Sequence, residues 1–416
     1  MTAPTEPTAP QAPQPAPLMS ERRVALIGAF LTVIGPISMA VYTPAMPEIV
    51  HAFGTTESAV KLTLSLYFAG FAIAQLICGP LSDGFGRRPI TLAFMAIYLA
   101  ASVLALFAPD VHVLMAARFL QGVGAAAGIA ISRALVRDLF THESSTRIMN
   151  MIGIMLAIGP AVAPTLGGVV MEFFGWHAIF LVMVAMGLGV VATTLFAMQE
   201  TVKRDLSRIR PRALAGNYRR LLTSPYFMLS AITIAGTTGA LYAWATMLPF
   251  IMMNRIGFSA SQFGLAMLLQ SGSYFFGSLA YRRVMRKFSG RYLVRIGLIM
   301  IALATFLIFL LPRLQEPTLL NIMGPVGLYA VGIAFIMPSM TTAAMAPFPH
   351  FAGASSAMLG FMQMGGGLVG SAAATLMANP LMAFATIIPV MGTVSLVSWL
   401  LWNRLPEPPA ISIVRS

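Results

Sequence analysis

The sequence contains few charged residues and a single cysteine, Cys78. Charged residues make up 9% of its 416 positions, whereas a soluble domain carries about 25% and needs them to cover its surface. One cysteine cannot form an intramolecular disulfide or supply the thiolates of a structural zinc or iron–sulfur centre. These absences exclude an ordinary soluble protein and a disulfide-stabilised secreted fold. The mean hydropathy of +0.82 indicates that lipid covers most of the surface.

Motifs for catalysis and nucleotide binding are also missing. The chain has no phosphate-binding loop with a following Lys-Ser or Lys-Thr, no G-x-S-x-G and no His-Glu-x-x-His. Gly365, Gly367 and Gly370 match G-x-G-x-x-G, but they lie in an apolar run with no preceding strand, where close helix packing explains them better. We therefore expect no enzyme activity, no cofactor and no metal site.

Long apolar segments dominate what remains. The first 20 residues are rich in proline and alanine, which predicts an extended tail, and they lack the apolar run of a secretory signal peptide. After them come twelve segments, each long enough to cross a hydrocarbon core of about 30 Å. They are 24–46, 60–79, 90–108, 112–134, 147–170, 176–198, 226–253, 262–281, 292–312, 320–346, 353–377 and 382–402.

The segments fall into two sets of six of nearly equal length, which indicates a duplicated unit of the kind found in transporters. We predict an all-α membrane protein with twelve transmembrane helices in two pseudo-symmetric six-helix bundles. The predicted bundles are 21–198 and 226–403, joined by a basic cytoplasmic connector at 199–225. We predict two cytoplasmic tails: a disordered, proline-rich segment at 1–20 and a second segment at 404–416.

The basic residues predict the orientation. Lys and Arg number 26 against 13 Asp and Glu, and basic loops are retained in the cytoplasm. With both termini inside, only Lys61, Arg255 and Arg313 fall at the outer loops. Charge placed in this way is a topology signal, and no basic cluster on a soluble domain supports a nucleic-acid partner. We expect a monomeric carrier whose partners are the lipid bilayer and a small-molecule substrate.

The loop after the second segment carries a specific motif. It reads Gly-Pro-Leu-Ser-Asp-Gly-Phe-Gly-Arg-Arg-Pro from Gly79 and fits G-x-x-x-D-x-x-G-R-[RK]. This motif resembles that of the major facilitator superfamily. Gly79 would allow close helix contact and Gly86 a tight turn. The resemblance implies that Asp83 faces the start of the eleventh span near Gly353, that Arg87 pairs with Asp138, and that a conformational lock forms from Gly79, Asp83, Gly86, Arg87, Arg88 and Asp138. The alternative is a solvated loop with topology-setting arginines.

Further segments narrow the resemblance, which covers residues 24–402. Arg118 to Gly124 is similar to the R-x-x-x-G-x-G segment of the superfamily, and the fifth span is similar to the helix that marks its antiporters, at Gly153, Gly159, Pro160, Pro164, Gly167 and Gly168. Segments at 42–47, 175–176 and 352–363 resemble the bicyclomycin and chloramphenicol resistance branch of the drug:proton antiporters. The resemblance implies proton-coupled export of small amphipathic compounds, by alternating access, across the bacterial cytoplasmic membrane.

One position departs from that branch. Its members carry an Asp two residues before the tyrosine of the Tyr-x-Pro segment, where this chain has Ala40. None of the thirteen acidic residues falls at mid-membrane. The alternative function is therefore a carrier for a neutral or anionic metabolite, working as exporter, symporter or facilitator, without a first-helix carboxylate for proton coupling.

Arg118 is a cation well inside the fourth span, where a central Arg costs roughly 2.5 to 3.5 kcal/mol. Without an acid at position 40, it predicts a preference for neutral or anionic substrates; the alternative is that it snorkels outward. Thirty methionines suit an adaptable apolar cavity. Polar and aromatic residues within it would bind substrate or couple transport, unless they fill helix interfaces: Arg118, Tyr42, Gln121, Tyr67, Gln75, Tyr242, Trp244, Gln270, Tyr274 and Gln363.

Overall fold

The computed structural model describes residues 18–140, 142–209 and 211–406, and its regular elements are helices. Most of the two predicted tails therefore lies outside the described residues. The first half contains α1 (Glu21–Ala40), α2 (Met46–Ala52), α3 (Glu57–Phe85), α4 (Arg87–Leu106), α5 (Val111–Leu139), α6 (His142–Phe174) and α7 (Trp176–Phe196). After α8 (Pro211–Leu222), the second half contains α9 (Pro225–Trp244), α10 (Ala260–Val284), α11 (Gly290–Leu314), α12 (Leu319–Met345), α13 (Ala352–Thr375) and α14 (Pro380–Trp402).

Ten membrane-spanning candidates in the described chain are long and apolar enough to cross a bilayer. Two more helices, α10 and α13, have 25 and 24 residues but contain more Ser, Gln and Gly, which lowers their hydropathy. At 1.5 Å per residue these two also extend about 36 Å. The prediction of an all-helical membrane protein is confirmed.

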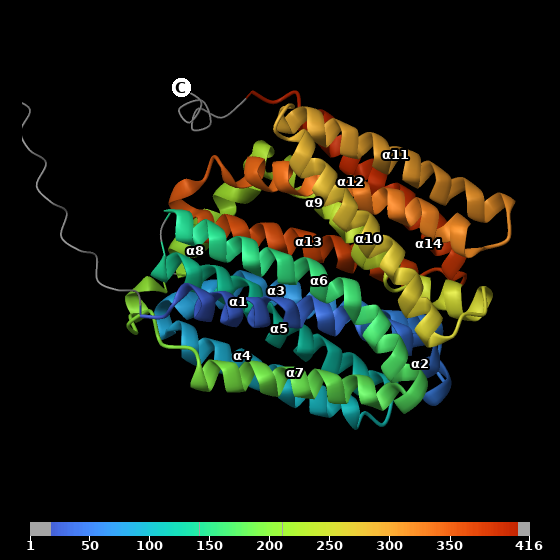
Figure 1. Cartoon of the computed structure of the whole chain (residues 1–416), viewed down its shortest axis with the longest axis horizontal. Helices are drawn as coiled ribbons and strands as arrows, with labels where there is room; N and C mark the ends of the chain where they lie inside the picture. The colour runs from blue at the N-terminus through green and yellow to red at the C-terminus, as the bar shows by residue number, and fades with distance from the viewer. Residues whose placement is uncertain (1–17, 141, 210, 407–416) are drawn as a thin grey trace, which may run out of the picture.

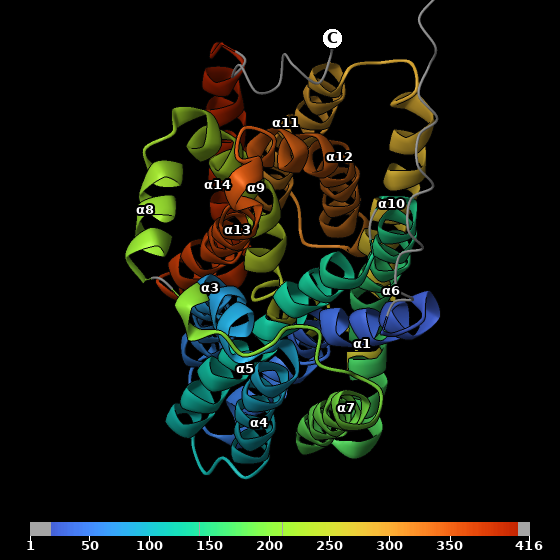
Figure 2. The same cartoon turned by 90° about the vertical axis from the view of Figure 1, so that its left-hand side faces the viewer.

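The two halves form separate bundles (Figures 1 and 2). Each has its own buried apolar core, which includes Phe68 and Leu114 in the first and Ile234 and Val326 in the second. Glycines allow helices to approach closely: a Cβ at Gly128 would lie 2.0 Å from the backbone oxygen of Leu31. In the eleventh span, Gly367 and Gly370 are likewise packed against neighbouring side chains, whereas the space beside Gly365 is open.

The first helix of each bundle is interrupted. The first span was expected to be continuous to about residue 46, but α1 ends at Ala40, and a short turn containing Pro44 precedes α2. In the second bundle, α9 ends at Trp244 and a π-helical turn at Phe250–Arg255 follows. Irregular backbone is tolerated at membrane depth where it lines a cavity. Both interruptions border the central cavity described below.

The connector contains a helix that the sequence prediction missed. Leu214, Tyr218 and Leu221 lie on one face of α8, and Leu221 is buried. The Tyr218 hydroxyl donates to the backbone oxygen of Leu76, 2.6 Å away. Burial raises the pKa of Tyr218 to about 12, so the phenol remains a donor at neutral pH. This bond ties the connector to α3.

The helices run between two ends of the molecule. The described chain begins and ends on the left of Figure 1, which we call the tail end, and the opposite end is the far end. The start of α1 meets the end of α7 there, where Arg23 Nε donates to the backbone oxygen of Ala197. Tyr226 at the start of α9 packs against Trp402 at the end of α14.

Candidate functional site

A cavity of about 360 Å³ lies between the two bundles. Residues of α1, α3, α5 and α6 form one wall, and residues of α9, α10, α12 and α13 form the other. Most of the lining is apolar, with polar side chains distributed among methionines and aromatic residues. The Trp244 indole donates to Gln270 Oε1 across 2.9 Å, whereas the buried Gln75 Oε1 has no hydrogen-bond partner. A cavity of this composition suits a small amphipathic molecule.

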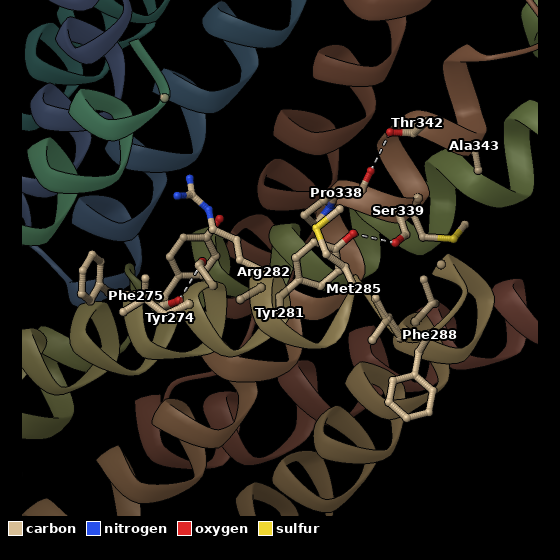
Figure 3. Close-up of a pocket in the computed structure, with 18 of the residues that line it drawn as sticks. Tyr274, Phe275, Tyr281, Arg282, Met285, Phe288, Pro338, Ser339, Thr342 and Ala343 are labelled. Carbon is tan, nitrogen blue, oxygen red and sulfur yellow. Dashed lines mark hydrogen bonds between the residues drawn. The ribbon is translucent and has the colours of Figure 1, made fainter. Parts of the chain in front are cut away.

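This central cavity joins a larger opening of about 1440 Å³. The two share Gly153, Ala161, Ser271 and Tyr274 in their linings. The opening lies in the tail half of the molecule, between α6 and the helices α10 and α12, and Figure 3 shows its second-bundle wall. No neighbouring atom lies within 4 Å of a Cβ placed at Gly153 or Gly272, so α6 and α10 diverge there.

The same two helices are in contact toward the far end. Thr165 donates to the backbone oxygen of Gly264 at 2.9 Å, and Glu172 accepts hydrogen bonds from Ser259 Oγ and the Ser261 backbone N–H, both 2.9 Å. The Glu172 carboxylate therefore caps α10 across the bundle interface.

A second contact at the far end joins α3 to the turn after α9. Glu57 accepts from the Asn254 amide at 3.3 Å, and Lys61, fully buried, lies over the Phe250 ring at 5.3 Å. Lys61 was expected at the outer start of the second predicted span, 60–79; α3 begins at Glu57 and places Lys61 inside the interface. The cavity is thus open toward the tail end and closed at the far end.

The structure separates the ten candidate substrate or coupling residues into two groups. Six line the central cavity: Gln75, Tyr242, Trp244, Gln270, Tyr274 and Gln363. The other four line neither cavity and form a buried cluster inside the first bundle: Arg118, Tyr42, Tyr67 and Gln121.

The Arg118 guanidinium is fully buried between two tyrosine rings. Its carbon lies 4.4 Å from the centroid of Tyr42 and 4.4 Å from that of Tyr67. Nη1 donates to Gln121 Oε1 at 2.7 Å, but Nε and Nη2 have no hydrogen-bond partner in the described structure. The tyrosine hydroxyls bond elsewhere, to Thr63 and the Gly35 backbone oxygen. The cluster is a desolvated cation held mainly by aromatic faces.

These contacts change two expectations about Arg118. With no exposed area, the side chain does not snorkel outward. It also does not border the cavity, because Tyr42 and Tyr67 cover it. Ala40 does line the cavity, so the position at which the resemblance implies an acidic residue faces this space.

Arg133 of α5 lines the central cavity and was not singled out from the sequence. Arg133 lies one residue before the end of the fourth span as predicted, at 134, but α5 continues to Leu139, so six more helical residues follow it. No Asp or Glu lines either cavity among the described residues. The apolar residues that continue past Arg133 were the signal from which the longer helix could have been predicted.

The loop motif forms a polar network at the tail end. Arg87 is 3% exposed and makes two hydrogen bonds to Asp138, from Nε at 2.9 Å and from Nη2 at 3.3 Å, as the resemblance implied. Asp83 pairs with the same guanidinium. Arg88 donates to backbone oxygens at the end of α7, including that of Leu195 at 2.8 Å. The network joins α3, α4, α5 and α7.

Glu200 belongs to this network and was not singled out from the sequence. Its carboxylate accepts from the backbone N–H groups of Arg87 and Arg88, at 2.8 and 3.0 Å, and so caps α4. Gly86 has φ +108°, which confirms the tight turn, and a Cβ there would lie 2.6 Å from Glu200 Oε2.

Two expectations for this loop are not met. The space beside a Cβ at Gly79 is open, whereas one turn earlier on α3 the Gln75 side chain packs against Gly360 of α13. No contact between Asp83 and the start of α13 is found in the described chain. The atom nearest to a Cβ at Gly353 is Nη1 of Arg137, 4.0 Å away.

The six motif positions of α6 have different surroundings. Cβ atoms at Gly167 and Gly168 would lie 2.3 Å from the backbone oxygens of Val41 and Ala260, respectively. Gly159 faces Ile37 and Val33, and Pro164 approaches Gly264. Gly153 faces open space, and of Pro160 the structure describes only its place in α6. Close packing is therefore concentrated at the far end of the helix.

A cavity between two helical bundles, open at one end and closed at the other, is the arrangement expected of a membrane carrier. No group of three or more metal-binding side chains is found among the described residues. The family model of the Major Facilitator Superfamily matches residues 28–374. The chain belongs to this superfamily: it is a multi-pass secondary transporter of a small molecule, and not an enzyme.

Bacterial relatives and a solved structure show similarity over most of the chain. The uncharacterized MFS-type transporter YdgK of Bacillus subtilis (strain 168) is 29% identical, covering 89% of this chain and 94% of the relative. The chloramphenicol resistance protein of Pseudomonas aeruginosa is 31% identical, covering 84% and 82%. A bacterial homologue of the human lysosomal transporter Spinster, in an inward-facing and occupied conformation, shares the fold with a TM-score of 0.72 at 16% identity, covering 92% and 97%.

Proposed function

We propose that the protein exports small amphipathic compounds, drugs among them, and that it belongs to the bicyclomycin and chloramphenicol resistance branch of the drug:proton antiporters. The central cavity carries this proposal: it is largely apolar, and its amide and aromatic groups include the unpartnered Gln75 Oε1. A buried acceptor without a partner suits a ligand donor. The chloramphenicol resistance protein from Pseudomonas aeruginosa supports the drug class.

The tail end is the cytoplasmic side in this proposal. The arginines of the loop motif and of α8 lie at that end, where positive charge is retained during membrane insertion. The described conformation is then inward-facing, with its cavity accessible from the cytoplasm and from the inner leaflet. Both termini would be cytoplasmic, in the inner membrane of a bacterium, and reporter fusions at each terminus test this topology.

A second function is favoured by the absence of a carboxylate from the described cavity lining. A carrier for a neutral or anionic metabolite needs no such group, whereas proton-coupled drug export in this branch uses the first-helix acid that Ala40 replaces. Proton coupling would then depend on groups outside the cavity.

Expression in a bacterial host that lacks its major efflux systems distinguishes the two functions. We expect resistance to a subset of amphipathic antibiotics, and we expect an uncoupler to abolish their outward transport in loaded cells. Unchanged resistance, together with uncoupler-insensitive movement of a metabolite, would favour the second function.

We propose that Asp83, Arg87 and Asp138 form a lock that stabilises the outward-open state. Asp83 is half-exposed here and pairs only within its own bundle in the described contacts, as expected when the tail end is open. Asp83→Asn should insert normally, because Arg87 keeps its two bonds to Asp138, but transport should fall several-fold. Initial transport rates, normalised to membrane protein abundance, test this; wild-type rates for the variant would contradict the lock.

A further inference from the structure

We infer that Arg133 is the anion-binding residue of the central cavity and holds the single acidic group of an amphipathic substrate. This inference rests on the proposed function, which it deepens by naming the substrate class. From the sequence, Arg118 was expected to set the preference for anionic substrates. Tyr42 and Tyr67 cover Arg118, and we therefore assign this preference to Arg133, which lines the cavity.

Arg133 reaches across the bundle interface. Its Nη1 donates to Ser356 Oγ of α13 at 2.9 Å, and this is the one hydrogen bond described for its side chain. A guanidinium has five N–H donors in a planar fork, so several remain for an oxyanion. The side chain is exposed to the cavity. An acid bound here would contact Arg133 of the first bundle beside Ser356 of the second.

No acidic partner neutralises this charge in the described structure. None of the ion pairs found among the described residues involves Arg133. Arginine also borders the larger opening: Figure 3 shows Arg282 extending from α10 into it. Cationic walls in a partly dehydrated cavity attract anions and repel cations.

The rest of the cavity determines the shape of the expected substrate. Apolar side chains, including Met39, Ile333 and Met364, surround a volume of about 360 Å³. Gln75, Gln270 and Gln363 supply hydrogen-bonding groups further along it. This arrangement fits a compound with one carboxylate or similar oxyanion at one end and a compact apolar or aromatic body.

Three matched compounds test the charge preference: 1-naphthylacetate, the neutral 1-naphthylacetamide and 1-naphthylethylammonium. Binding to the purified full-length protein is measured as ligand-dependent thermal stabilisation, followed by size-exclusion chromatography of a fluorescently tagged chain. We expect the wild-type protein to bind the carboxylate about fivefold or more tightly than the amide, and the ammonium most weakly.

Variants separate charge from structure. Arg133→Gln should make the carboxylate and amide affinities equal, while Arg133→Lys should keep part of the preference. Ser356→Ala removes the cross-bundle hydrogen bond but keeps the charge, so the preference should persist. Arg147→Gln is the matched control, because this exposed arginine pairs with Glu21 outside the cavity. Ala40→Asp adds a carboxylate to the cavity wall and should shift the preference toward the ammonium.

Equal affinities for the carboxylate and amide in the wild-type protein would overturn the inference, as would an unchanged ratio in Arg133→Gln. Failure of all three compounds to stabilise the protein at millimolar concentration would also overturn it. The proposed export function is judged separately: resistance and uncoupler-sensitive efflux of neutral drugs would stand even if no preference for the carboxylate were found.

Discussion

Replacing Gly168 with alanine is expected to reduce transport about fivefold or more, because the added methyl prevents the far end from closing. A Cβ at this position would lie 2.3 Å from the backbone oxygen of Ala260, and backbone atoms cannot rotate away as a side chain would. Overpacking of this kind costs about 1 to 3 kcal/mol, and each 1.4 kcal/mol changes an equilibrium about tenfold. The protein should therefore shift away from the described conformation.

Gly365→Ala is the matched control for this experiment. It makes the same chemical change within another long helix, α13, but no atom lies within 4 Å of the new methyl, and Gly365 is not among the residues that line the two cavities. Transport should therefore remain near the wild-type rate. The conformational shift can be measured by thiol labelling of Thr165→Cys, since Thr165 contacts Gly264 in the closed far end. The native Cys78 is buried and gives little background. Equal transport by Gly168→Ala and Gly365→Ala would show that far-end packing does not limit the cycle.

Replacing Arg118 with leucine should nearly abolish transport without lowering thermal stability. Two guanidinium nitrogens, Nε and Nη2, are buried without partners, and removing an imperfectly paired buried charge in favour of an apolar side chain is often neutral or stabilising. The presence of Arg118, despite the free-energy cost of burying an incompletely paired charge, therefore indicates a functional role. In the proposed transport cycle, the guanidinium couples α5 to the interrupted first span through the Tyr42 ring.

Arg118→Lys distinguishes charge from shape at this site. An ammonium keeps the positive charge, but it lacks the planar group that packs between Tyr42 and Tyr67. We expect this variant to retain little transport. Transport rates and melting temperatures of both variants should be measured in parallel. If Arg118→Leu transports at the wild-type rate, the cluster is only structural; if it unfolds, the aromatic contacts outweigh the unpaired donors.

The tail-end network shows what a local motif can predict. The pairing of Arg87 with Asp138 and the tight turn at Gly86 followed from the residues of a recognisable loop. Glu200 was not identified, because a single acid after a hydrophobic span has no distinctive spacing. Its role as the cap of α4 depends on where the end of the sixth span returns in space.

The candidate cavity residues show the opposite case. Tyr67 and Gln75 lie on the same helix, eight residues apart, yet Gln75 borders the cavity while Tyr67 packs over Arg118. Arg133 lies one residue before the end of the fourth span as predicted from the sequence, and only the tertiary structure places it beside the cavity. Side-chain chemistry alone could not distinguish these environments.

The sequence by itself determined the class of protein, the approximate positions of the spans and the family resemblance. Apolar run length, the placement of basic residues and the loop motif are properties of neighbouring residues, so they can be recognised without a fold. The tertiary structure decided which polar residues meet at the cavity, that Arg118 is covered, and which end is open. In a bilayer, apolar side chains face both lipid and protein, so hydrophobic periodicity does not mark the face that lines a cavity. Packing between helices distant in sequence makes that distinction.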